Sequence, residues 1–243
     1  MLIHLFDRNI ATPEVTAKLA ELSLSDSGLL NNPFEQTQEN ASVIDSAALG
    51  HLLSLLSRRL FSAHLIYRLQ EAAAPLLSIF VCGDHMITAA YMRDGIRFSE
   101  ALNPNDVNPL LLQALSILPN APHEGDAVYT VKGAQLAYDV FNHPDDLSLE
   151  PADDALLETL HTAIDEPRVD CLLQDKGSEP LVWTSIKNGE RTLTITPAEN
   201  QTLQIVAGSL YPLFEGLNHI LLDRFRFSLK AVEAYRAKHD NQF

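Results

Sequence analysis

Three residues that can do chemistry stand close together in "IFVCGDHMITA", residues 79–89. A thiol, a carboxylate and an imidazole are the groups of a cysteine active site. Side chains alternate between the two faces of a strand, so Cys82 belongs to a strand interior, where a free cysteine behaves as a small hydrophobe. Gly83 and Asp84 are turn residues, and a cysteine nucleophile usually takes its histidine from elsewhere in the fold, which makes His85 a weak candidate. The sequence therefore predicts a turn between two strands at this point.

The other polar residues form no recognisable catalytic or metal-binding motif. The nine histidines give no HExxH or His-x-His spacing and the two cysteines no CxxC, so we expect no metal and no cofactor. His143, Asp145 and Asp146 in "FNHPDD" lack the spacing of a calcium loop, and we expect a solvated linker there. The sequence also has no GxSxG, P-loop or GxGxxG motif. We therefore expect a protein that is not an enzyme and has no catalytic residues.

Composition is typical of a globular protein with its own core. The chain has 243 residues, of which 46% are hydrophobic and 20% charged. Cys82 and Cys171 lie in apolar, strand-like runs, and buried thiols are the simplest interpretation, with a single disulfide left open. The start of the sequence has no signal-peptide pattern, and the longest apolar run, residues 72–83, is shorter than the roughly 20 residues of a membrane span. We expect a cytoplasmic protein that does not insert into membranes.

Charge is distributed unevenly along the chain. The net charge is −15, yet the segment from Asp223 to the C-terminus carries +2, which leaves −17 on the remainder. Nucleic-acid binding requires a cationic surface that releases phosphate counterions. The acidic body therefore argues against a nucleic-acid partner, and its simplest role is to keep the protein soluble.

Two passages share an order of turn, strand and proline signals: "MRDGIRFSEALNPNDVNPLLLQALSILP", residues 92–119, and "IKNGERTLTITPAENQTLQIVAGSLYP", residues 186–212. In each, Asp-Gly or Asn-Gly suits a two-residue hairpin turn. A proline followed by an acid then suits the start of a helix, and a second proline suits its end. The aligned pairs are Gly95 with Gly189, Pro104 with Pro197, and Pro119 with Pro212. We predict a duplicated unit, with chance similarity of hairpin sequences as the alternative.

The preceding segments extend both copies. Residues 45–61 and 151–165 have the apolar spacing of amphipathic helices, and residues 63–70 and 168–175 have the composition of strands. The predicted fold is one α+β domain over residues 1–243, with a central, mostly antiparallel sheet and flanking helices. It contains a quasi-two-fold repeat of helix, meander and helix at about 45–138 and 152–214. We also expect a short strand in "LIHLFD", a helix beginning at Thr12 and a polar loop at 23–44.

The C-terminal segment is predicted to be a helix from about 215 to 238, with Gly216 as a point where it could break. Its apolar residues exceed what one helix face usually holds: Leu213, Phe214, Leu217, Ile220, Leu221, Phe225, Phe227 and Leu229. Core packing is one interpretation, and a groove for a partner helix is the other. For this second interpretation the predicted partner-binding residues are Leu213, Phe214, Leu217, Ile220, Leu221 and Phe225.

The arrangement resembles the EspG family, the cytosolic chaperones of type VII (ESX) secretion. The similar stretches are "PLLSIFVCGDHMITAAYMRDGIRF", "QALSILPNAPHEGDAVYTV" and "PLVWTSIKNGERTLTITPAENQTLQIVAGSL". The resemblance implies an EspG-like fold and binding of a helical secretion substrate of the PE/PPE type, which the chaperone keeps soluble until export. The resemblance implies binding without catalysis.

Two other functions stay open from the sequence. One is a structural or interaction protein that forms a homodimer through its C-terminal helix. The other is a hydrolase-type enzyme with a site between the two halves, to which Cys82, His85 or the acidic residues of 139–154 would contribute.

Overall fold

The structure is a computed structural model that describes residues 2–5, 46–70, 72–93, 95–120, 125–134, 136–137, 139–142, 146–198 and 202–239. Several sequence predictions fall outside these residues. They are the helix from Thr12, the loop at 23–44, and the roles of Asp94, His143, Asp145 and Glu199.

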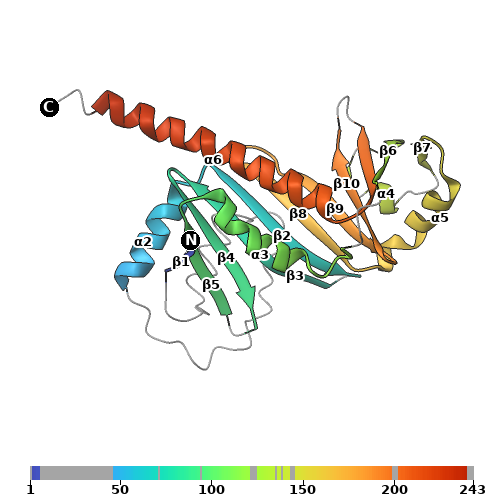
Figure 1. Cartoon of the computed structure of the whole chain (residues 1–243), viewed down its shortest axis with the longest axis horizontal. Helices are drawn as coiled ribbons and strands as arrows, with labels where there is room; N and C mark the ends of the chain where they lie inside the picture. Colours follow the sequence, from blue (N-terminus) through green and yellow to red (C-terminus); the bar gives the residue numbers. More distant parts are fainter. Residues whose placement is uncertain are drawn as a thin grey trace.

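A single antiparallel sheet runs through the described part of the chain (Figure 1), with the strand order β1-β5-β4-β3-β2-β8-β9-β10-β11-β6-β7. The strands are β1 (Leu2–His4), β2 (Phe61–Leu69), β3 (Ala72–Cys82), β4 (His85–Met92), β5 (Gly95–Ala101), β6 (Ala127–Lys132), β7 (Ser148–Glu150), β8 (Arg168–Asp175), β9 (Leu181–Asn188), β10 (Arg191–Pro197) and β11 (Leu203–Gly208). The predicted α+β class and antiparallel sheet are confirmed.

The sheet is built outward from the pairing of β2 with β8. Phe61 lies opposite Asp175 and Arg68 opposite Arg168, so the two strands pair along almost their whole length. From this centre β3, β4 and β5 follow in order on one side, and β9, β10 and β11 on the other. Each meander is joined by short turns, because antiparallel neighbours need no crossover.

The two meanders correspond at a constant distance in the sequence. Gly83 in the turn between β3 and β4 and Gly189 in the turn between β9 and β10 are 106 residues apart, and both have positive φ angles, of 70° and 58°. The same offset of 106 carries β2 to β5 onto β8 to β11 to within three residues at every strand end. It also carries the register of the β3–β4 pair onto that of the β9–β10 pair.

The alignment of the two passages predicted from the sequence is therefore wrong by one strand. Gly95 is the first residue of β5 and follows the β4–β5 turn, whereas Gly189 lies in the β9–β10 turn, one turn earlier in its meander. The first passage does contain the expected helix after Pro104, but residues 203–208 of the second passage form β11 instead of a helix. Pro212 begins the last helix rather than ending one. Asp-Gly and Asn-Gly suit any hairpin, so these signals could not identify which turn they formed.

Helices cover both faces of the sheet. On one face lie α2 (Ser46–Ser57), α4 (Asp139–Asn142) and α5 (Asp154–Thr162), and on the other lie α3 (Asn108–Leu115), with the 3-10 turn η2 (Pro104–Val107) before it, and α6 (Tyr211–His239). A second 3-10 turn, η4 (Ala163–Asp165), follows α5. Asp153 caps α5 by accepting a hydrogen bond from the Leu156 amide (2.9 Å).

The long helix α6 crosses the sheet obliquely, and its C-terminal part projects past the sheet (Figure 1). It begins at Tyr211, before the predicted start, and continues through Gly216 without a break. A Cβ atom at position 216 would lie 3.0 Å from the ring of Trp183 in β9, so the glycine lets the helix approach the sheet closely.

Candidate functional site

The Cys82–His85 segment forms the turn between two strands, as predicted. Gly83 and Asp84 connect β3 to β4, and Cys82 lies opposite His85 at the end of the strand pair. The Cys82 side chain is buried under α2, and burial raises the pKa of its thiol to about 12, with a small opposing effect from the charge of Arg59. A thiol with that pKa is almost entirely protonated at neutral pH and is a poor nucleophile.

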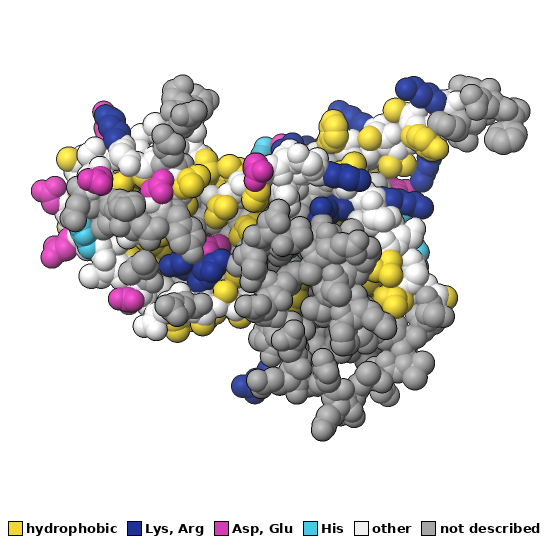
Figure 2. Space-filling model, turned by 180° about the vertical axis from the view of Figure 1, so that it is seen from behind, with side chains coloured by type: hydrophobic (Ala, Val, Ile, Leu, Met, Phe, Trp, Pro, Cys, Tyr) yellow, Lys and Arg dark blue, Asp and Glu magenta, His cyan; other side chains and the backbone are white. Residues whose placement is uncertain are grey.

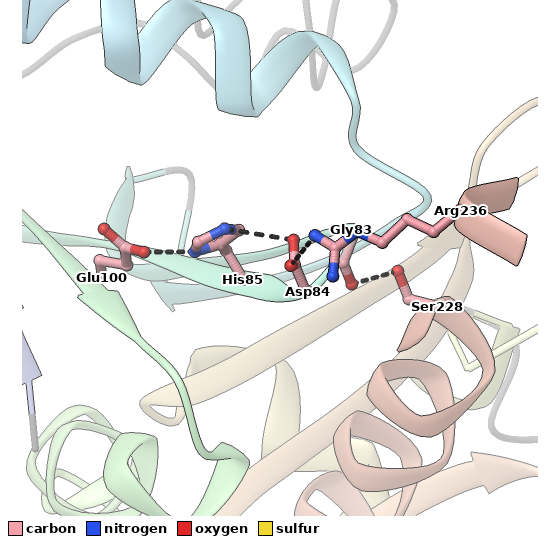
Figure 3. A network of polar contacts seen from close by, with 6 residues as sticks. All are labelled: Gly83, Asp84, His85, Glu100, Ser228 and Arg236. Carbon is pink, nitrogen blue, oxygen red and sulfur yellow. Dashed lines mark hydrogen bonds and ion pairs between the residues drawn. The ribbon is translucent and has the colours of Figure 1, made fainter. Parts of the chain in front are cut away.

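The polar residues of this turn hold the end of α6 instead. Figure 3 shows a chain of contacts that runs from Glu100 in β5 through His85 and Asp84 to Arg236 in α6. The two ring nitrogens of His85 face carboxylates, Nδ1 that of Glu100 and Nε2 that of Asp84, at 3.1 Å in the second case. Arg236 donates to Asp84 Oδ2 at 2.9 Å. A continuous chain of polar contacts therefore links β5 to α6.

Electrostatics and backbone contacts both favour this anchoring. Burial pushes the pKa of Asp84 up, but the hydrogen bonds from its own backbone amide and from Arg236, with the nearby charges of His85 and Arg236, outweigh burial and hold the pKa below its usual value. The Ser228 hydroxyl donates to the Gly83 carbonyl at 2.5 Å, and Val232 lies over Gly83. Three successive turns of α6 thus contact one hairpin.

Most of the partner-binding residues predicted from the sequence lie in the core. Leu213, Leu217, Leu221 and Phe225 are buried against β2, β3 and β8, and Phe214 and Ile220 pack beside them half-buried. The core interpretation therefore describes the four buried side chains, which have no surface on which a partner could bind.

In the C-terminal part of α6, exposed apolar side chains begin at Phe227, two residues after the buried Phe225. Phe227 is 66% exposed and Tyr235 is 63% exposed, and Ala231 and Ala234 are exposed between them. Residues 227, 231, 234 and 238 follow the 4-3-4 spacing of a coiled-coil seam, so they lie along one side of the helix. We call Phe227, Ala231, Ala234 and Lys238 the α6 seam. The spacing was visible in the sequence, but exposure depends on where the sheet ends.

The part of α6 that carries this seam is rich in basic residues. From Asp223 to His239 the helix carries five basic residues against two acidic ones. Figure 2 shows hydrophobic and basic side chains together on the projecting end of α6, and acidic side chains gathered at the opposite end of the molecule. Arg224 and Arg236 are bound to Asp175 and Asp84. Lys230 and Lys238 are exposed beside or within the seam.

An apolar groove lies between α3 and the strands β3 and β4. Its volume is about 210 Å³. Its apolar lining comes from Leu76, Leu77, Ala90, Met92, Leu110, Ala114 and Ile117. Ile117 and the neighbouring Leu112 are exposed at its rim.

The sites proposed for a hydrolase do not come together. Three of the described acids in residues 139–154 serve local structure: Asp139 accepts from the Leu136 amide, Glu150 pairs with Lys132, and Asp153 caps α5. These elements lie at the opposite end of the sheet from the β3–β4 turn (Figure 1). Cys82 and Cys171 are both buried free thiols, and they belong to cores on opposite faces of the sheet.

A serine–histidine contact that the sequence analysis missed lies at the centre of the sheet. Ser78 Oγ is 2.8 Å from His64 Nδ1, and the two residues face each other across β2 and β3. Both side chains are buried, and burial, with a smaller effect from the charge of Arg59, lowers the pKa of His64 to about 3. An imidazole with this pKa is a weak base at neutral pH. No sequence motif could reveal the pair, because it forms across strands.

This histidine predicts a specific pH dependence of stability. The folded-state pKa of about 3 lies below the unfolded value of 6.5, so between these values only the unfolded chain binds the proton. Stability is therefore retained above pH 6.5 and falls as the pH decreases, by about 1.4 kcal/mol per pH unit from this group. Urea unfolding at pH 7.5, 6.5, 5.5 and 5.0 measures the slope. His64→Gln should flatten it, and an unchanged slope in this variant would contradict the assignment.

Within the described ranges, no group of three or more His, Cys, Asp or Glu side chains could hold a metal ion. No described helix combines the length and apolarity needed to cross a membrane.

Comparison with known proteins gives structural matches but no match by sequence. No protein-family model matches the chain, and no curated protein matches it significantly. Among the solved structures that match is the Mycobacterium tuberculosis type VII secretion system chaperone EspG5 in complex with the PE25–PPE41 dimer. It shares 11% sequence identity over 92% of this chain and 95% of that chain, with a TM-score of 0.46. At this identity and TM-score, the likeness does not assign the chain to a family.

Proposed function

We propose that the protein is a non-enzymatic binding protein for a helical segment of another protein, and that the α6 seam is its docking surface. The observation that carries the proposal is an aromatic side chain, Phe227, left 66% exposed in a coiled-coil spacing on a helix that projects from the body. Aromatic side chains exposed in this way are the usual anchors of protein interfaces, and helices recognise one another through such spacing.

The anchoring of α6 to the sheet favours the same role. Ser228, Val232 and Arg236 fasten the helix to the β3–β4 turn, and the seam lies on a different side of the helix from these three contacts. A surface that is already ordered loses little conformational entropy when a partner binds, which improves affinity for a given contact area.

The specific form of the proposal follows the sequence resemblance. The protein would act in the cytoplasm as a chaperone that keeps a helical PE/PPE-like substrate soluble for type VII secretion. The fold would be EspG-like, and the halves would be an internal repeat aligned at the offset of 106 residues rather than at Gly95 and Gly189.

Co-expression with a PE–PPE-type heterodimer encoded in the same genome tests this function. The wild-type chain should retain the heterodimer during affinity purification, and Phe227→Ser should weaken binding by about 30-fold, the loss typical of an aromatic anchor. Tyr211→Ser is the matched control, because Tyr211 is 54% exposed at the other end of α6. Failure to retain the heterodimer would contradict the secretion role, and equal effects of the two variants would contradict the seam.

A further inference from the structure

We propose that the α6 seam selects an acidic amphipathic helix and rejects a second copy of this chain. This inference rests on the proposed function of the seam and names the chemistry of its partner. It is carried by the combination of exposed apolar residues with basic side chains on one projecting element.

The seam has the shape that a helix needs. Ala231 and Ala234 are small and lie between the larger side chains of Phe227 and Lys238. Small residues let a second helix approach closely, and the aromatic ring supplies apolar area at one end of the contact. A partner with apolar residues at 3- and 4-residue spacing would bury Phe227.

Charge decides which helix fits. The whole chain has a net charge of −15, yet the helix from Asp223 to His239 has a net charge of +3, so the basic character is local. Lys230 flanks the seam and Lys238 continues it, in the positions where coiled coils place the charges that select partners. Glutamates flanking the apolar stripe of a partner would meet these two ammonium groups, whereas lysines there would be repelled.

The same charges disfavour a homodimer through this helix. Two copies of the α6 seam would bring together two helix ends that each carry a net charge of +3, and like charges repel. The acidic end of the molecule could attract the basic helix of a second copy, but its helix α5 keeps Leu156 and Leu160 buried and exposes Asp154, Ala155 and Glu158. It therefore offers charge without an apolar stripe to cover Phe227.

Two synthetic peptides test the inference on the 243-residue chain. Both have about three heptads with leucine in the seam positions. One carries glutamate and the other lysine at the flanking positions, and fluorescence anisotropy measures their binding. We expect the glutamate peptide to bind at least about tenfold more tightly, with the difference shrinking as salt is raised from about 0.05 to 0.5 M, because added salt screens exposed charges.

Charge reversal provides the matched control. Lys230→Glu combined with Lys238→Glu should invert the preference for the two peptides, and the variant should unfold at the same temperature as the wild type, since both side chains are exposed. Phe227→Ser should weaken binding of the glutamate peptide at every salt concentration.

The outcomes separate the inference from the proposed function. Equal binding of the two peptides, still dependent on Phe227, would overturn the acidic preference and leave the seam as a docking surface. Binding of neither peptide would overturn the docking surface itself. Sedimentation that shows a dimer abolished by Phe227→Ser would overturn the inference in favour of a second copy.

Discussion

Replacing Asp170 by alanine should destabilise the protein by about 3–5 kcal/mol, the loss typical of a buried ion pair that loses one partner. Asp170 is 1% exposed in β8 and accepts hydrogen bonds from Arg68 Nε at 2.5 Å and Thr184 Oγ1 at 2.9 Å. Arg168 Nε is 3.8 Å away. These groups come from β2, β8 and β9, so the carboxylate binds the two halves of the sheet together. Without it, the Arg68 guanidinium loses the carboxylate with which it pairs in the described part of the chain.

A second ion pair from the same strand gives the control. Asp175 pairs with Arg224 at 2.7 Å, but both side chains are nearly half exposed. Asp175→Ala should therefore change stability by about 0–1 kcal/mol. Urea unfolding at neutral pH measures both variants. Comparable losses in the two would show that the pair at Asp170 is hydrated and does not join the halves.

The second large effect is expected at Leu217. This side chain is 1% exposed between α6 and the sheet, and truncating it to alanine should cost about 2–5 kcal/mol through lost burial and the cavity left behind. Phe227→Ala, ten residues later on the same helix, should change stability by less than about 0.5 kcal/mol, because its ring is mostly in water. The comparison separates the core side of α6 from its docking side.

Unfolding and binding must be measured on both variants. Leu217→Ala should lower the urea midpoint and leave peptide binding intact where the protein is folded. Phe227→Ala should leave the urea midpoint unchanged and weaken peptide binding. A small effect of Leu217→Ala on stability would mean that α6 packs loosely against the sheet. The six residues predicted from the sequence to bind a partner would then again be candidates for that role.

The sequence predicted the class of fold because strands and turns carry local signals. The antiparallel meanders, the turn at Gly83–Asp84, the helix after Pro104 and the long C-terminal helix were all foreseeable from alternation, turn composition and apolar spacing. The alignment of the halves was not. Hairpin turns share their chemistry, so local composition could not distinguish the turn at Gly95 from the turn equivalent to Gly83.

The candidate site was also predictable from the sequence only in part. The sequence by itself determined that α6 is rich in apolar residues, that its C-terminal half is basic, and that Phe227, Ala231 and Ala234 follow a seam spacing. Only the tertiary structure decided that Leu213, Leu217, Leu221 and Phe225 are core and that the seam is exposed, because the sheet ends beneath the helix. The physical reason is that periodicity fixes which residues share a side of a helix, whereas burial depends on elements distant in sequence that cover that side.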